Sequence, residues 1–186
     1  MKKTTSGLIF KGRYKFTIAN IVTEYQKKLN LQIERVKAKG GKYLHLVAEL
    51  NDICETKIIF ADNIIPTTGL ALITNNLTDA SPTNSMRINY CSVGTGTTAP
   101  ALGDTTLETE TFRNTIASQT NSSGVAYNTM FISAGDDDGT YKEFGLFADA
   151  TVTLDSGVLF SRVAINITKS NLQTLTIDHT LSLTNA

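Results

Sequence analysis

The feature that most constrains the fold is a series of turn-forming clusters that divides the carboxy-terminal half into short segments. Gly, Asn, Ser and Asp gather at residues 121–124, 135–139 and 155–157, and these residue types favour tight turns. The segments between them are rich in β-branched and aromatic residues, which favour strands. Turns spaced by roughly ten to fifteen residues predict a β-sandwich or jelly-roll-like domain.

The clearest strand pattern lies near the amino terminus. Between residues 8 and 18, apolar residues occupy every second position, and Lys11, Arg13 and Lys15 alternate with them. This period of two indicates a strand with one buried face and one basic face. Shorter patterns predict strands at 29–33, 43–50, 56–61, 86–93, 115–120, 125–133, 141–148, 158–167 and 172–183. Residues 20–28 and 104–113 stay open between a helical turn and an extended segment.

One segment has helical rather than strand periodicity. Residues 66–77 place Leu70, Ile73 and Leu77 on one helical face, and Pro66 stands at the start, where a missing N–H costs least. We therefore expect a mainly β protein with one short α-helix. Residues 1–62 are expected to form a basic amino-terminal β region, an assembly arm or a small β subdomain, and residues 63–186 the β-sandwich domain.

Charge is distributed unevenly along a chain whose net charge is zero. Residues 1–60 hold 12 of the 17 Lys and Arg but only 5 of the 17 Asp and Glu, so they carry +7 and the remainder carries −7. The positive charges are scattered rather than packed in one block, so no nucleic-acid partner is expected. They form either a solvated face or a surface on which copies pack basic against acidic regions. In the second case Lys11, Arg13 and Lys15 are the candidate assembly contacts.

Composition excludes several classes of protein. No apolar run approaches the ~20 residues that cross a bilayer, so no membrane span is expected, and the opening MKKTTSGLIFKG lacks the apolar core of a signal peptide. Two cysteines, Cys54 and Cys91, are too few for a disulfide scaffold.

Residue chemistry yields no catalytic constellation. The run Gly94-Thr-Gly-Thr-Thr lacks the lysine of a phosphate-binding loop, and the Asp136–Asp138 run between two glycines is typical of a solvated turn rather than a calcium site. His45 and His179 have no neighbours at metal-ligand spacing, and no serine lies in a G-x-S-x-G elbow. We expect no catalytic, cofactor or metal site, and no enzyme.

Several motifs in a fixed order resemble a known family. They are Ile64-Ile65, Gly69-Leu70 and Asn76-Leu77, the run Cys91-Ser-Val-Gly-Thr-Gly-Thr-Thr-Ala-Pro-Ala-Leu-Gly-Asp-Thr-Thr-Leu107 with Glu110 and Arg113, then Gly139-Thr140, Glu143-Phe-Gly-Leu-Phe147, Leu159-Phe-Ser-Arg162 and Leu175-Thr-Ile177. Together they resemble virion proteins of tailed bacteriophages that are described as tail fibre or tail proteins. The resemblance covers residues 58–183. The chain departs from the family pattern at Pro66 and in the long basic segment 27–57 that precedes the matched region.

The resemblance implies a virion structural protein that is made in the host cytoplasm, where Cys54 and Cys91 stay free thiols. It assembles with copies of itself and with other phage proteins of the tail, baseplate or capsid. Its motif residues are expected to be structural, with Glu143 and Arg162 pairing across neighbouring strands. The candidate structural residues are Gly94, Gly96, Pro100, Asp104, Arg113, Glu143, Gly145 and Arg162.

Three other interpretations stay open. The first is a head decoration or head-fibre protein that clamps capsomers. The second is a host-glycan-binding module, in which tyrosines substitute for the missing tryptophan. The third is a tail-borne hydrolase, which would need a carboxylate pair. The only dense acidic clusters are Glu108 with Glu110 and residues 136–138, and neither is flanked by an aromatic platform for a substrate.

Overall fold

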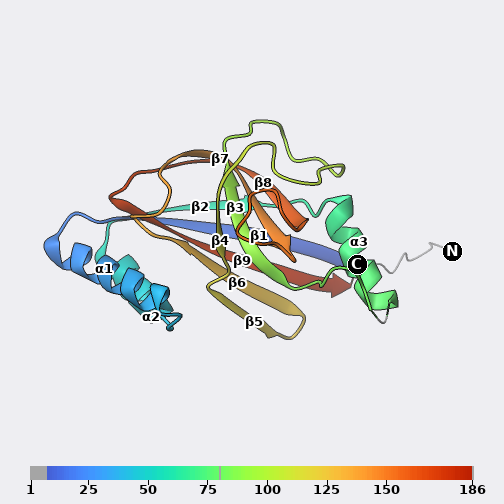
Figure 1. The fold of residues 1–186 in the computed structure, drawn as a ribbon, viewed down its shortest axis with the longest axis horizontal. Coiled ribbons are helices and arrows are strands. Elements are labelled where there is room, and N and C mark those ends of the chain that lie inside the picture. Colours follow the sequence, from blue (N-terminus) through green and yellow to red (C-terminus); the bar gives the residue numbers. More distant parts are fainter. Residues whose placement is uncertain (1–7, 80, 186) are drawn as a thin grey trace.

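The structure, a computed structural model that describes residues 8–79 and 81–185, contains two antiparallel sheets packed face to face (Figure 1). Sheet A has five strands in the order β2 (Thr56–Asp62), β1 (Leu8–Asn20), β9 (Gln173–Asn185), β6 (Val125–Ile132) and β5 (Ser118–Ser122). Sheet B has four, in the order β4 (Glu110–Thr115), β3 (Ile88–Gly94), β7 (Gly139–Ala148) and β8 (Val158–Lys169). The expectation of a mainly β, sandwich-like protein is confirmed.

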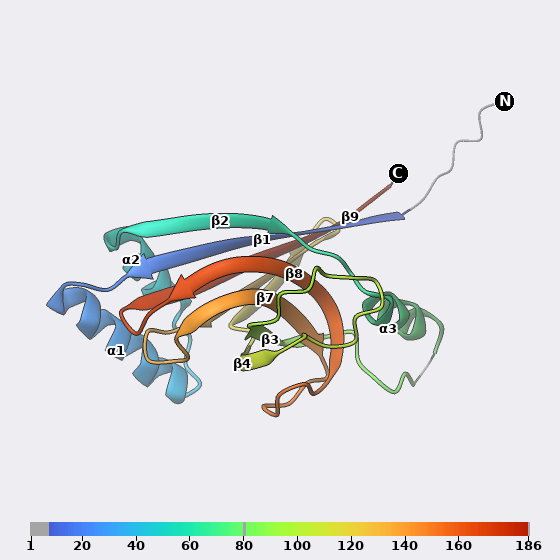
Figure 2. The same cartoon turned by 90° about the horizontal axis from the view of Figure 1, so that it is seen from above.

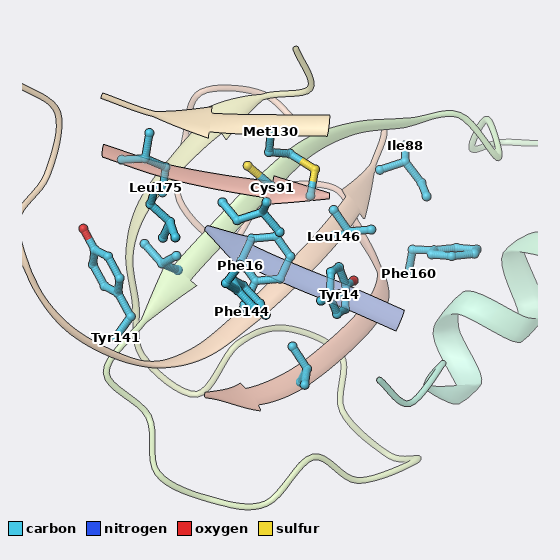
Figure 3. Close-up of a cluster of buried hydrophobic side chains, with 14 of the residues drawn as sticks. Tyr14, Phe16, Ile88, Cys91, Met130, Tyr141, Phe144, Leu146, Phe160 and Leu175 are labelled. Atoms are coloured by element: carbon cyan, nitrogen blue, oxygen red, sulfur yellow. The ribbon is translucent and has the colours of Figure 1, made fainter. Parts of the chain in front are cut away.

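Aromatic side chains from the centre of each sheet form the middle of the core (Figure 3). Tyr14 and Phe16 of β1 contribute inward-facing rings, and Phe144 of β7 meets them from the opposite sheet. The ring centroid of Phe144 lies 5.0 Å from that of Tyr14 and 5.5 Å from that of Phe16, both edge-on. Edge-to-face aromatic pairs stabilise a core beyond the area that they bury, so these three rings fix the distance between the sheets.

The sheets are also joined along both sides. On one side the chain leaves β2, and Ile64 and Arg162 exchange two backbone hydrogen bonds of 3.1 Å. On the other side β4 runs on into β5, and the Asn114 side chain donates to the Phe131 carbonyl at 3.0 Å. The two sheets are thereby linked along both sides.

Two helices stand where the sequence predicted strands. α1 (Glu24–Ala38) begins with a capping box in which Thr23 and Gln26 bond each other's backbone, and α2 is Leu44–Ile53. The alternation of Leu29, Leu31 and Ile33 suggested a strand, but Leu29 and Ile33 are buried and Leu31 is 54% exposed. Residues four apart share a helical face, so the strands predicted at 29–33 and 43–50 are wrong. The protein has three helices in its described part, not one.

The helices α1 and α2 cover part of the outer face of sheet A, at the end of the molecule opposite α3 (Figures 1 and 2). Their apolar residues share a second core with Phe131 of β6, which points away from the main core. The Gly40-Gly41 turn expected from the sequence ends α1, with Gly40 at a φ of 68°. None of the three helices is both long and apolar enough to cross a membrane, as far as the described residues show.

The predicted helix over 66–77 is confirmed as α3 (Thr67–Thr78). Its buried face differs from the expected one, because Gly69 and Leu72 are buried whereas Leu70 and Leu77 are 42% and 75% exposed. Gly69 allows the helix to approach β8 closely, since a Cβ there would lie 2.4 Å from the carbonyl oxygen of Phe160. Apolar residues on α3 therefore remain at the surface.

The amino-terminal strand is an interior strand of sheet A. β1 pairs with β9 from Leu8 to Asn20 and with β2 from Arg13 to Ala19. Tyr14 and Phe16 belong to the same core as residues of β7 and β9. The expected boundary between residues 1–62 and 63–186 therefore does not coincide with a boundary between the sheets, and the described part of the expected arm is built into the sandwich. Residues 1–7 lie outside the described residues.

Both cysteines are free thiols, as expected. Cys91 lies in the core with 1% exposure, and burial raises its pKa to about 12. Cys54 is partly exposed at the end of α2, where partial burial also raises the pKa of the thiol. Since only the thiolate reacts readily, these shifts make both thiols less reactive than a fully exposed cysteine.

Candidate functional site

The long connection from β3 to β4, residues 95–109, lies over the outer face of sheet B. Leu107 in this connection packs into a small core with Phe147 and Leu159 on that face. Gly145 makes room for it, because a Cβ at this position would lie 3.0 Å from the Leu107 side chain. We call residues 95–109 the cover loop.

Glu143 of β7 holds the cover loop through backbone hydrogen bonds. Its carboxylate, 1% exposed, accepts from the N–H groups of Gly96 at 3.0 Å, Glu108 at 2.9 Å and Thr109 at 2.8 Å. A Cβ at Gly96 would lie 2.4 Å from Glu143 Oε1, so a side chain at this position would displace the carboxylate. Gly94 is needed for the same reason, because a Cβ there would lie 2.3 Å from the Thr109 carbonyl oxygen.

Arg162 of β8 completes the network. Its guanidinium donates to Glu143 Oε2 at 2.8 Å, to Asp104 Oδ2 at 2.6 Å and to the Thr98 carbonyl at 3.3 Å. The expected pairing of Glu143 with Arg162 is therefore present, and both side chains are buried. A buried pair is tolerated only when its remaining polar atoms find partners, and here the cover loop supplies them.

The carboxylates of the cover loop are held in their charged form. Partial burial alone would raise the pKa of Asp104, but hydrogen bonds from the Ala101 N–H and from Arg162 outweigh it and keep the pKa below its usual range. Hydrogen bonds from the N–H and hydroxyl of Thr98 likewise lower the pKa of Glu108. Pro100 lies half-buried in the same loop.

A second ion pair holds the loop between β7 and β8. Arg113 and Glu110 of β4 form a bidentate pair at 2.6 and 2.7 Å, buried beside the ring of Phe147. The Arg113 guanidinium also donates to the Thr151 carbonyl at 2.9 Å and to Ser156 Oγ at 2.7 Å. Arg113 thus fixes residues 151–156 as Arg162 fixes the cover loop.

All eight candidate structural residues therefore meet on the outer side of sheet B. Among their partners, sequence reasoning missed Thr98 and Glu108. Glu108 was considered only as part of an acidic cluster, whereas Glu110 was named with Arg113 in the motif run. The spacing of three residues between Glu110 and Arg113 could have suggested an ion pair. Its burial, however, depends on the loop at 151–156, whose position the sequence does not specify.

The candidate assembly contacts lie elsewhere, on the outer face of sheet A. Arg13 lies 3.9 Å from Asp62, Lys15 lies 3.9 Å from Asp178, and all four side chains are at least 42% exposed. Loose pairs of this kind contribute little to stability. The face formed by Lys11, Arg13, Lys15, Phe60, Asp62, Asp178 and Thr180 is named here the open face.

The open face differs from the other sheet surfaces because no described element packs on it (Figure 2). The two inner faces form the core, the outer face of sheet B carries the cover loop, and α1 and α2 cover the opposite end of sheet A. Two exposed aromatic residues, Phe60 and Tyr127, stand on the two sides of the open face, 55% and 43% exposed. The sequence did not single out Phe60.

Polar side chains inside the sandwich offer no accessible reactive group. His179 is 1% exposed, burial lowers its pKa to about 4, and its Nδ1 bonds Asn128. The Tyr14 hydroxyl bonds Ser161 in the same interior. Within residues 8–79 and 81–185, no group of three or more His, Cys, Asp or Glu side chains is placed to hold a metal ion.

Comparison with models of protein families, with curated proteins and with solved structures finds no match for this chain. The resemblance to phage tail proteins therefore depends on the motif residues alone.

The buried pair predicts a specific loss of stability. Glu143→Gln removes one oxygen acceptor and leaves Arg162 without its central partner, so we expect a loss of about 3 kcal/mol in the free energy of unfolding, as for other broken buried pairs. Urea denaturation measures this loss, and limited proteolysis should show new cleavage within residues 95–109. Glu49→Gln is the control, because Glu49 is an exposed residue whose hydrogen bond to Tyr25 lies at the surface. Equal stabilities for the two variants would contradict the assigned role.

Proposed function

We propose that this chain is a structural protein of a bacteriophage virion, associated with the tail, the baseplate or a fibre. It acts by symmetric assembly with copies of itself and by docking other virion proteins. The observation that carries the assembly role is the open face, the one broad sheet surface that no described element covers. The motif pattern of residues 58–183 supports the phage assignment.

The motif residues suit such a role because they set shape rather than chemistry. Glu143 and Arg162 bond each other and use their remaining hydrogen bonds to hold the cover loop. Arg113 holds the loop at 151–156 in the same way. Loops held in this way present the same surface in every copy. Repeated, identical contacts are what a symmetric assembly requires.

The proposal is tested on purified phage particles. Mass spectrometry of gradient-purified virions should detect this chain in an amount comparable with other structural proteins. Antibody labelling under the electron microscope should then place it on the tail or baseplate. Labelling on the head would favour the decoration or head-fibre alternative, and absence from purified particles would remove the virion assignment altogether.

Charge reversal tests the open face as an assembly contact. The triple variant Lys11→Glu, Arg13→Glu, Lys15→Glu should remain folded, since these side chains point away from the core, and should fail to self-assemble. Wild-type assembly should weaken toward 1 M salt, where the Debye length shrinks to about 3 Å. Sedimentation at low and high salt measures both effects.

The matched control is Lys28→Glu, Lys39→Glu, Lys42→Glu, which makes the same change in net charge on exposed residues away from the open face. If the two triple variants assemble equally well at every salt concentration, the charges of β1 form only a solvated surface.

Binding of a host glycan is a second candidate function of the same face. It is favoured by Phe60 and Tyr127, exposed aromatic rings at the sides of a strip of Arg13, Asp62 and Thr180 that offers hydrogen bonds to sugar hydroxyls. Tyr127→Ala should then abolish binding of the protein to host cells, whereas Tyr25→Ala, on exposed α1, should not. Equal binding by both variants would remove this candidate.

A further inference from the structure

Part of β1 has an open backbone edge. β1 pairs with β9 along its whole length, but its pairing with β2 begins only at Arg13, opposite Asp62. Figure 2 shows β1 and β9 running on past the end of β2, where the chain turns away toward α3. Residues Leu8–Lys11 therefore lack a neighbouring strand on one side within the described chain.

The backbone groups on this side can be identified. The Gly12 carbonyl accepts from Asn63 N–H at 3.4 Å, so Gly12 directs its polar groups toward the β2 side. Backbone groups of successive residues alternate between the two sides of a strand. Leu8 and Phe10 consequently direct their N–H and C=O groups to the open side, where an added strand can pair with them.

The hollow over the open face reaches this open edge. Its volume is about 790 Å³, and beside the residues of the open face its lining includes Phe10, Gly12 and Asn63. We call the part of the hollow beside these three residues the groove. An extended segment placed there would continue sheet A, in the way that peptides add to an exposed sheet edge.

We propose that this edge is occupied by residues 1–7 of a second copy, with the two β1 strands paired antiparallel about a two-fold axis. This inference rests on the proposed self-assembly and names its contact. The segment directly precedes Leu8, and seven extended residues span about 23 Å, enough to pass the four open positions. In a two-fold pair the same edge serves both copies, so each supplies the strand that the other lacks.

The composition of the segment fits the groove. Thr4 and Thr5 favour strands, and Lys2 and Lys3 would reach the end of β2, where the Asp62 side chain is 88% exposed. For residues 1–5 to pair with the open edge of their own β1, the chain would have to turn back at Ser6 and Gly7. The same residues of a second copy reach that edge without a turn. The sheet would then continue from one copy into the next.

The test removes a single backbone donor. Leu8→Pro deletes the N–H on the open side and leaves the groups that face β9, and proline is tolerated at the first residue of a strand. Leu8→Ala is the matched control, because it shortens the same side chain and keeps the N–H. A third variant lacks residues 2–7.

Sedimentation equilibrium of the full chain should show a dimer that Leu8→Pro and the truncation weaken at least about tenfold, since a two-fold contact loses the bond twice. Leu8→Ala should stay within about threefold of wild type. Hydrogen exchange at the Phe10 amide should slow as protein concentration rises. Circular dichroism should show the same strand content in all variants.

Three results would overturn the proposal. If the Leu8→Pro and Leu8→Ala variants dimerise equally well, the contact lies elsewhere. If the wild-type protein stays monomeric up to high concentration, a second copy does not occupy the edge. A Phe10 amide protected equally at every concentration would show that the chain's own segment fills the groove. Each result leaves the virion assignment untouched, because that assignment is decided by the presence of the chain in purified particles.

Discussion

The buried pair of Glu143 and Arg162 is the interaction on which the outer side of sheet B depends. The Glu143 carboxylate accepts hydrogen bonds from three N–H groups of the cover loop. The Arg162 guanidinium bonds that carboxylate and also bonds Asp104 and the Thr98 carbonyl. Removing these charges from water is costly, and the cost is offset because the cover loop fills their hydrogen-bonding capacity. The loop, in turn, shields the small core around Leu107 and Phe147.

This dependence explains why the motif residues occur together. Gly94 and Gly96 permit the close approach of the loop, Gly145 accommodates Leu107, and Arg113 repeats the arrangement at the neighbouring loop. The part of the pattern between Gly94 and Arg162 therefore describes one physical unit, a sheet face with its loops fixed by two buried ion pairs. A unit of this kind maintains a shape, which agrees with the structural role proposed for the chain.

Sheet A, by contrast, has an outer surface that the described elements leave uncovered. The open face of sheet A carries loosely paired charges and two exposed aromatic rings, and the unpaired edge of β1 adjoins it. Rim charges mainly set the rate and specificity of association, whereas backbone pairing sets geometry. The two features therefore have separable effects, and the variants proposed for each distinguish them.

The sequence by itself determined the sandwich class and most of its strands, because period-two alternation and turn clusters depend on local chemistry. The motif resemblance pointed to Glu143 and Arg162, whereas Thr98 and Glu108 were found only in the structure. The sequence did not determine α1 and α2. Leu29, Leu31 and Ile33 fit both a strand and, with Leu31 outward, a helix. The capping box of Thr23 and Gln26 and packing against α2 and Phe131 favour the helix. The interior position of β1 in sheet A was likewise decided by tertiary structure. Its pairing with β9 joins residues at opposite ends of the chain, and local pattern carries no information about which distant strand becomes the neighbour.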